Sequence, residues 1–155
     1  MQKITPFLWF EKNAEQAVKF YTSIFKNSKV TGVLRCGDAG PGPKGSVLTM
    51  SFKIEGVEFT VLNGGSNFKF TPATSFVVHC KTQKDVDYYW RKLSPGGKHL
   101  QCGWLTDKFG VTWQIVPDGF IDLLMNKNPD KAKRAMAAMM KMTKLDIHKL
   151  KQAIK

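Results

Sequence analysis

Apolar and polar residues in the first half of the chain follow an order that predicts a strand, a helix and three further strands. Asn13 precedes apolar residues at helical spacing, and Gln16 stands three positions later, as in a capping box. The turn Glu55-Gly56 separates two strand-like segments, which predicts a hairpin. The predicted strands of this half cover 4–10, 29–35, 46–54 and 57–62.

The second half of the chain repeats this order. Thr82 is predicted to cap a helix that has Asp85 at its third position, and Pro95-Gly96-Gly97 is predicted to end it. Between Leu93 and His99 there is room only for a short extra edge strand. The predicted strands of this half cover 74–80, 99–106 and 110–116.

The two halves match at fixed offsets. An offset of 69 residues places Phe7 on Phe76, and an offset of 54 residues places 56–62 on 110–116. Caps and apolar positions stay in register together, so the pattern indicates an internal duplication. Each module alone would leave one face of its sheet uncovered. The predicted fold class is therefore α+β, built from tandem βαβββ modules.

The residues after the modules have a helical pattern. One helix is predicted to begin at Pro129, and Asp146 is predicted to cap another. An apolar stripe in this tail is predicted to pack on the domain or on a second copy of the chain. The stripe consists of Ala132, Met136, Met139, Met140 and Thr143. The predicted domain covers 1–125, with modules at about 1–70 and 71–120, and the tail covers 126–155.

More than half of the chain's formal net charge of +12 lies in the tail. From Asn126 to Lys155, nine Lys or Arg residues less two Asp residues give +7, which leaves +5 for residues 1–125. The basic residues are not interleaved with aromatic ones, so nucleic acid is not the expected partner. No apolar stretch approaches the roughly 20 residues of a membrane span, so no membrane partner is expected.

The cysteines and the start of the chain indicate a reducing compartment. Cys36, Cys80 and Cys102 are odd in number and form no C-x-x-C pair, which argues against a disulfide framework. The chain begins directly with strand-like residues and without a signal-peptide pattern. The expected location is the cytosol.

Several segments resemble one known family. They are Pro6 to Phe10, Ala17 to Tyr21, Gly40 to Val47, Leu62 to Gly65, Phe68 to Pro72, Gln101 to Leu105 and Trp113 to Pro117. Together with the duplicated module, they resemble the PhnB-like branch of the vicinal oxygen chelate superfamily. This superfamily has the fold of glyoxalase I, bleomycin-resistance proteins and extradiol dioxygenases, and the branch is often labelled 3-demethylubiquinone-9 3-methyltransferase-like. The resemblance covers nearly the whole chain, the tail included.

The resemblance implies a divalent metal held by the first and last strands of each module. The corresponding positions in this chain are Pro6, Thr60, Ser75 and Gln114. A proline side chain cannot ligate a metal, hydroxyl groups are poor neutral ligands, and Gln114 offers one carbonyl oxygen. Transition-metal sites use three or four good donors. We therefore expect a member of the superfamily without a metal and without a cofactor.

The glycines Gly40, Gly42 and Gly45 have the spacing of a dinucleotide-binding fingerprint. That fingerprint requires a strand before it and a helix after it, whereas prolines fill the gaps here and a strand is predicted to follow. We therefore reject it, and its rejection also weakens a methyltransferase interpretation. An ordinary hairpin connection is preferred, and an anion contact through Lys44 at a cavity mouth is left open.

Two residues are candidates for chemistry. His79 has the strand parity of Ser75 and Val77, but no carboxylate partner is placed near it, so a wall residue is preferred. Cys102 is predicted on a strand edge beside Trp104, without an activating base, so an inert buried thiol is preferred. No catalytic residue is assigned.

What remains is a cavity with apolar walls and a few polar anchors, which suits a small, partly aromatic ligand. The predicted function is a metal-free, homodimeric, small-molecule-binding protein. The alternative is an enzyme acting on a small aromatic or quinone-like substrate, either a methyltransferase or a glyoxalase- or dioxygenase-like lyase or oxidoreductase. The predicted pocket residues are Leu8, Phe10, Thr60, Leu62, Ser75, Val77, His79, Cys102, Trp104 and Gln114.

Overall fold

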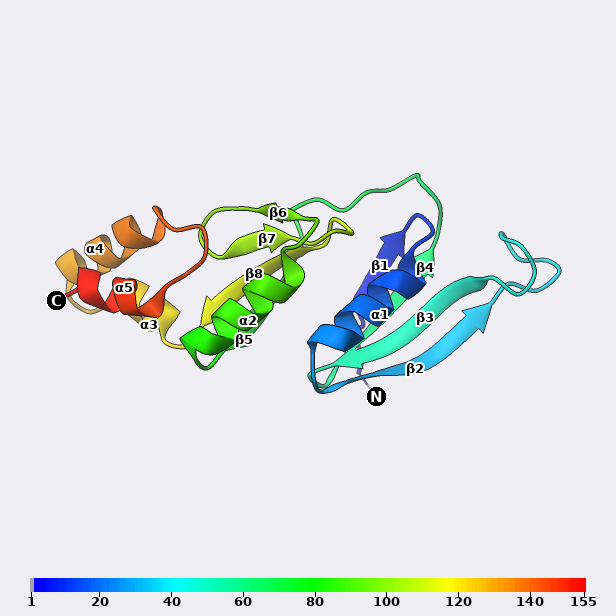
Figure 1. Cartoon of the computed structure of the whole chain (residues 1–155), viewed down its shortest axis with the longest axis horizontal. Helices are drawn as coiled ribbons and strands as arrows, with labels where there is room; N and C mark the ends of the chain where they lie inside the picture. Colours follow the sequence, from blue (N-terminus) through cyan, green and yellow to red (C-terminus); the bar gives the residue numbers. More distant parts are fainter. Residues whose placement is uncertain (1) are drawn as a thin grey trace. The chain divides into compact units, whose positions relative to one another are not determined.

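Two compact units make up the chain, and the boundary between them falls after Lys69 (Figure 1). The computed structural model describes residues 2–155. Unit 1 ends at Lys69, and unit 2 runs from Phe70 to Lys155, so the helical tail belongs to unit 2.

Unit 1 contains one βαβββ module. Its sheet has the strand order β1-β4-β3-β2; β1 is parallel to β4, and the other neighbours are antiparallel. The elements are β1 (Phe7–Phe10), α1 (Ala14–Ile24), β2 (Ser28–Arg35), β3 (Val47–Ile54) and β4 (Val57–Asn63).

Unit 2 begins with the same module. Its sheet has the order β5-β8-β7-β6, again with one parallel pair, β5 with β8. The identical topology confirms the predicted α+β fold class and the tandem arrangement of the two modules. The elements are β5 (Ser75–Cys80), α2 (Gln83–Leu93), β6 (Lys98–His99), β7 (Trp104–Thr106) and β8 (Thr112–Pro117).

The core of unit 1 lies between α1 and one face of its sheet. The ring of Tyr21 in α1 stacks on Phe52 with centroids 6.2 Å apart, and Phe52 stacks on Phe59 at 5.5 Å. Burying an aromatic side chain of this kind contributes about 1.5–3 kcal/mol. The predicted helical stripe is confirmed, because Ala14, Ala17 and Tyr21 are all buried.

The N-terminus of α1 differs from the prediction. The Asn13 side chain makes no capping bond. Instead Oδ1 of Asn63, at the end of β4, accepts a hydrogen bond from the backbone N–H of Ala14 at 2.9 Å. A residue 49 positions away therefore caps the helix. The prediction for α2 is confirmed, since Thr82 and Asp85 form a reciprocal capping box.

The predicted strand at 99–106 is wrong. A turn divides it into β6 and β7, with Cys102 at φ +60° and Gly103 at φ +84°. A side chain at Gly103 would place its Cβ 2.9 Å from the carbonyl oxygen of Ile115 and from Leu145 of the tail. The close approach of the tail thus accounts for a turn where alternation alone predicts a continuous strand.

The tail consists of α3 (Phe120–Leu124), α4 (Pro129–Met139) and α5 (Ile147–Ala153). Its core joins Val116 and Phe120 to Leu145 and Leu150, all buried. Met136 and Met140 of the predicted stripe are 44% and 59% exposed within the chain, so these two do not pack on the domain, and packing on a second copy stays a prediction. The buried position of α4 is Ala135, with Ala138 and Met139 packed against the tail core.

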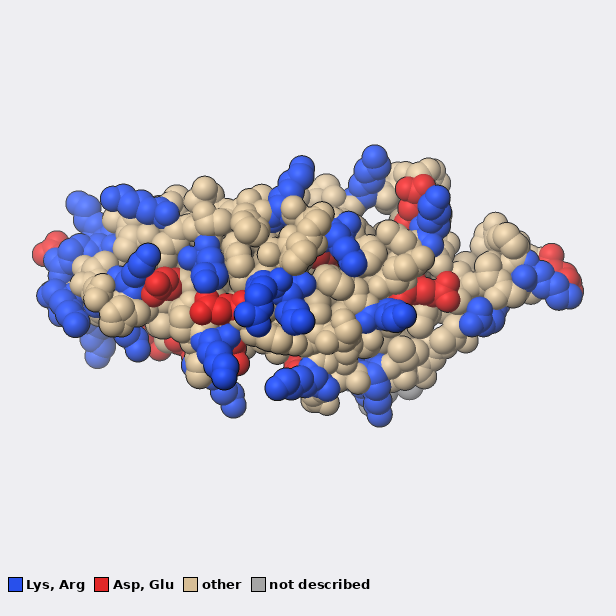
Figure 2. All heavy atoms as spheres, in the orientation of Figure 1, with Lys and Arg blue, Asp and Glu red and all other residues tan. Residues whose placement is uncertain are grey.

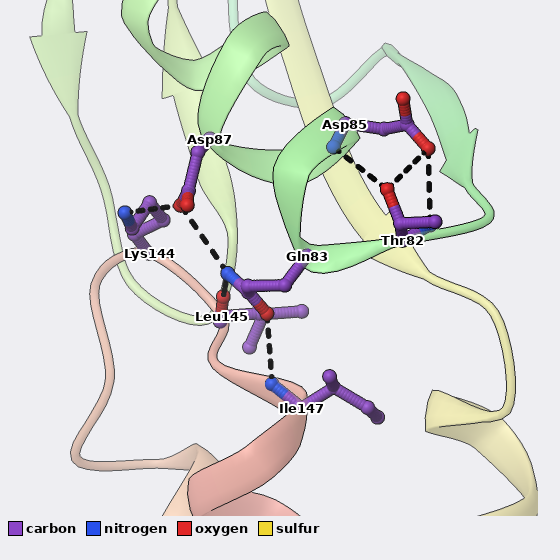
Figure 3. A network of polar contacts seen from close by, with 7 residues as sticks. All are labelled: Thr82, Gln83, Asp85, Asp87, Lys144, Leu145 and Ile147. Atoms are coloured by element: carbon purple, nitrogen blue, oxygen red, sulfur yellow. Dashed lines mark hydrogen bonds and ion pairs between the residues drawn. The ribbon is translucent and has the colours of Figure 1, made fainter.

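Polar contacts also hold the tail to α2 (Figure 3). Nε2 of Gln83 donates to the carbonyl oxygen of Leu145 at 3.0 Å, and its Oε1 accepts from the backbone N–H of Ile147 at 3.0 Å. The ammonium group of Lys144 donates to the carboxylate of Asp87. One side chain thus satisfies two backbone groups at the start of α5.

The surface of the tail is strongly basic. Figure 2 shows lysine and arginine side chains gathered around α4 and α5. Arg134 is engaged within the tail, since its Nε donates to the carbonyl oxygen of Ala153 at 3.0 Å. No helix within residues 2–155 has the length and apolar character needed to cross a membrane.

The ion pair of Asp87 with Lys144 gives a pH-dependent prediction. The hydrogen bond from Lys144 lowers the pKa of Asp87, with a smaller contribution from Gln83. Asp87→Asn should therefore reduce the free energy of unfolding at neutral pH. Because both partners are about half exposed, the loss should be no more than about 0.5 kcal/mol.

The sign of the pH dependence follows from the lowered pKa. The stabilisation is complete above the ordinary pKa of an aspartate and is lost as the pH falls through the lowered one. Urea unfolding of the two proteins should give stabilities that converge in acid. Asp122→Asn, at an exposed position of α3, is the matched control. A difference that stays constant down to the acid limit would contradict this account.

Candidate functional site

Strand pairing in unit 1 assigns side chains to the two faces of the sheet. Trp9 pairs with Leu62, and Leu8 pairs with Val61, which is fully buried. Neighbouring partners share a face and successive residues alternate. Trp9 and Leu62 therefore lie on the open face, together with Thr60, on the side away from α1.

Two of the predicted pocket residues belong to the core instead. Leu8 and Phe10 are 9% and 2% exposed and lie on the α1 side of the sheet. They cannot share a cavity with Leu62, which has the opposite parity. The prediction assigned the faces of β1 one residue out of phase, and an error of one residue exchanges the two faces of a strand.

Unit 2 brings five predicted residues together on one face of its sheet. Gln114 pairs with both Val77 and Trp104. Its Nε2 donates to Oγ of Ser75 at 2.9 Å. His79 follows Val77 at the spacing that keeps it on the same face. Val77 is 44% exposed, so this face is open within unit 2.

Neither Cys102 nor Cys80 is placed as a nucleophile for the open face. Cys102 lies in the β6–β7 turn and its thiol donates to the carbonyl oxygen of Met139 at 3.7 Å, so it faces the tail and not the open face. The predicted strand-edge position of Cys102 is therefore wrong. Burial, followed by the nearby carboxylates of Asp85 and Asp118, raises the pKa of Cys80 to about 12, which keeps this thiol protonated.

A cavity of about 560 Å³ lies in unit 1, at the end of the sheet where β1 and β4 finish and the loop 36–46 begins. We call it the Trp9 cavity. Leu62 alone of the predicted pocket residues lines it. Its lining is Trp9, Lys12, Glu15, Arg35, Cys36, Pro41, Gly42, Pro43, Ser46, Val47, Leu48, Leu62, Asn63, Gly64 and Gly65.

Trp9 is the aromatic wall of the cavity and is held on three sides. Its indole N–H donates to the carbonyl oxygen of Gly65 at 2.8 Å. The ring of Phe68 meets it edge-on with centroids 5.0 Å apart. A Cβ on Gly64 would lie 2.3 Å from the indole, so only glycine allows the ring to lie against the backbone there. The wall is therefore fixed before any ligand arrives.

The loop 36–46 forms the opposite side of the cavity. The backbone N–H of Cys36 donates to the carbonyl oxygen of Ser46, and its carbonyl oxygen accepts from the backbone N–H of Gly45, each at 2.8 Å. A Cβ on Gly40 would lie 2.9 Å from Cβ of Cys36, so the loop folds tightly over this residue. The loop leads into β3 and not into a helix, which confirms that the glycine spacing is not a dinucleotide fingerprint.

Charged side chains line the rim of the cavity. Lys12 and Arg35 carry positive charge and Glu15 carries negative charge. Nη1 of Arg35 donates to the carbonyl oxygen of Gly45 at 3.0 Å. Lys44 does not line the cavity; it pairs with Asp38 at 2.8 Å, and both are well exposed.

The positions implied as metal ligands do not fit a metal. The carbonyl oxygen of Pro6 accepts from the backbone N–H of Thr60 at 2.9 Å, and the Thr60 hydroxyl lies 3.3 Å from that of Ser51. The amide of Gln114 already donates to Ser75. Within residues 2–155, no three His, Cys, Asp or Glu side chains come together as a metal site would require.

Gly64→Ala tests the wall of the cavity. The added methyl group must displace the indole of Trp9, which should cost about 1–3 kcal/mol of stability and shift the Trp9 indole N–H signal in an NMR spectrum. Gly37→Ala is the control, since its Cβ would meet no atom within 4 Å. An unchanged indole signal in the Gly64 variant would mean that the wall is not fixed as described.

Comparison with known proteins places the chain in a family. Residues 2–116 match the family model for 3-demethylubiquinone-9 3-methyltransferase. A PhnB protein from Bacillus cereus is 40% identical, with a TM-score of 0.69, and the similarity covers 75% of this chain and 99% of that one. No protein with a curated description matches the chain.

Two more distant structures share the fold. A protein from Pseudomonas aeruginosa is 18% identical, with a TM-score of 0.63, covering 76% of this chain and 98% of that one. The fosfomycin resistance protein FosX from Listeria monocytogenes, in complex with Mn(II) and sulfate, is 15% identical with a TM-score of 0.51, covering 74% and 92%.

The family match ends at residue 116, so the expectation that it includes the tail is wrong. The match covers the two duplicated modules, and FosX shares their fold. The chain belongs to the PhnB-like 3-demethylubiquinone-9 3-methyltransferase family.

Proposed function

We propose that this chain is a small-molecule-binding protein and that its ligand occupies the Trp9 cavity. The volume of about 560 Å³ lies within the range of roughly 300–1,000 Å³ that small-molecule sites span. The flat face of Trp9 offers a stacking surface, and the charged rim offers polar contacts that orient a ligand. The cavity carries the proposal, because it combines both features within one unit.

Binding is favoured over catalysis by the chemistry of the lining. Its titratable side chains are Lys12, Glu15, Arg35 and Cys36, and no histidine is among them. Cys36 is 6% exposed and is enclosed by its own loop, which leaves its thiol poorly placed for attack on a substrate. The family name suggests a methyltransferase, but a loop that leads into a strand does not supply the strand–turn–helix unit of a nucleotide-type site.

The open face of unit 2 is a second candidate surface. Trp104, Val77 and Gln114 there combine an aromatic side chain, an apolar side chain and an amide. This surface includes half of the pocket residues that the sequence predicts. This face is the alternative ligand site to the Trp9 cavity within the same chain.

Native mass spectrometry tests the proposed function. The protein incubated with a cell extract should retain a small-molecule adduct. Trp9→Ala should lose it, since removal of the stacking surface should cost about 1–3 kcal/mol of binding free energy. Trp104→Ala is the matched control and should retain the adduct. Loss in the Trp104 variant alone would transfer the site to unit 2, and consumption of the compound with release of a product would favour the enzyme alternative.

We also propose that the chain forms a homodimer. β2 is the edge strand of its sheet within unit 1, and Val30, Val33 and Leu34 on it are 47%, 48% and 56% exposed. An edge with exposed β-branched and apolar residues favours pairing with another chain.

Light scattering tests the dimer. The full chain should have about twice its mass of 17.5 kDa. Val33→Lys should shift the population toward the monomer, because a charge on an edge strand opposes pairing. Val57→Lys, which replaces a similarly exposed valine on β4, is the control. A full-length protein that is monomeric at micromolar concentration would refute the dimer and leave the fold unaffected.

A further inference from the structure

The charges on the rim of the Trp9 cavity are unpaired. Lys12, Glu15 and Arg35 form no ion pair with any residue in the described part of the chain, 2–155. Arg35 makes one hydrogen bond, through Nη1 to Gly45, which leaves most donors of its guanidinium available. Two cations against one carboxylate give the rim a net positive charge.

Arg35 lines the cavity and lies beside an irregularity in the strand pairing. The pairing of β2 with β3 shifts register between Leu34 and Arg35, and Arg35 is then opposite Val47, another lining residue. Register irregularities of this kind change the direction of a side chain, and they are common beside functional sites. The irregularity lies at the last residue of β2, where the loop over the cavity begins.

In unit 2 the tail contacts the counterparts of several elements that lie beside the Trp9 cavity. The offsets place Leu62 on Val116 and Ala14 on Gln83, and the loop 36–46 corresponds to the β6–β7 turn. In unit 2 the tail segment 142–147 contacts all three of these elements.

The contacts of this segment have a definite polarity. Its carbonyl oxygens at Met142 and Thr143 accept from the backbone N–H groups of Cys102 and Gly103, at 2.9 and 2.7 Å. The side chain of Leu145 packs against Val116 in the tail core. The segment therefore presents acceptor oxygens to the turn and an apolar group to the sheet.

We infer that the Trp9 cavity binds a small organic acid. The inference rests on the proposed function and specifies its ligand class. A flat apolar body lies against Trp9, and the carboxylate accepts hydrogen bonds from the guanidinium of Arg35, with Lys12 as a second cation on the rim. Such an acid has the same two features as the tail segment in unit 2, namely acceptor oxygens and an apolar group. In the Trp9 cavity charged side chains take the place of the backbone N–H donors.

Three probes of similar size and different charge test the inference: benzoate, benzamide and benzylamine. Binding is measured by the shift of the Trp9 indole N–H signal, assigned with Trp9→Phe. Benzoate should bind about tenfold more tightly than benzamide, because a charge-assisted hydrogen bond replaces a neutral one, and benzylamine should bind weakest. Arg35→Gln should remove the preference for benzoate, and Glu15→Gln should increase the affinity for it. Lys44→Gln, beside the cavity but not lining it, should change nothing.

The outcomes separate this inference from the proposed function. Equal affinity for the three probes, or tighter binding of benzamide or benzylamine, would overturn the acid class and leave the cavity as a binding site. A preference for benzoate that survives Arg35→Gln would overturn the role of Arg35. No shift of the Trp9 signal by any probe at millimolar concentration would overturn both proposals.

Discussion

The side chain of Asn63 connects the elements on which the Trp9 cavity depends. Its Oδ1 accepts from the first N–H of α1, and its Nδ2 donates to the carbonyl oxygen of Val47, the first residue of β3. It therefore joins the end of β4 to both neighbouring elements. Because these groups are partly buried, losing one partner would leave the others without hydrogen bonds, at a cost of about 1–3 kcal/mol for each. The glycine pair that supports Trp9 follows Asn63 directly, so its position depends on the same contact.

The two modules share one topology but differ in the connection between their second and third strands. In unit 1 the connection between the second and third strands is long and bends over Cys36, which leaves space beside Trp9. In unit 2 the equivalent connection is a short turn through Cys102 and Gly103, and backbone bonds attach it to the tail. Loop length and a C-terminal extension, and not the arrangement of strands, therefore make the two modules differ at this connection.

Much of the fold could be predicted from sequence, because repeated caps and apolar spacings are local signals. The faces of β1 could not, since Phe7 to Phe10 are all apolar or aromatic and alternation cannot distinguish Leu8 from Trp9. The residue that caps α1 could not be predicted either. Asn63 is distant in sequence, and the local pair Asn13 and Gln16 has the spacing of a capping box.

The remaining errors have physical causes as well. Cys102 adopts a positive φ without being glycine, and a single glycine beside it, Gly103, does not distinguish a turn from a bulge within a strand. Methionines occur on both the exposed and the buried side of α4, so their spacing could not give the orientation of the helix. The sequence could place Ser75, Val77 and Gln114 on one face of the unit 2 sheet, because its strands alternate clearly. The Trp9 cavity was missed, because a Gly- and Pro-rich loop carries no periodicity.

The tail segment 142–147 makes the two modules inequivalent, because it contacts the second one. Two modules of the same origin would ordinarily present two equivalent surfaces. In this chain the tail segment contacts the β6–β7 turn and Val116 of the second module, and because it is covalently attached its effective concentration does not fall on dilution. Under the proposed function, a chain without this segment is expected to expose a second surface beside Val116 with no change to any residue of the Trp9 cavity.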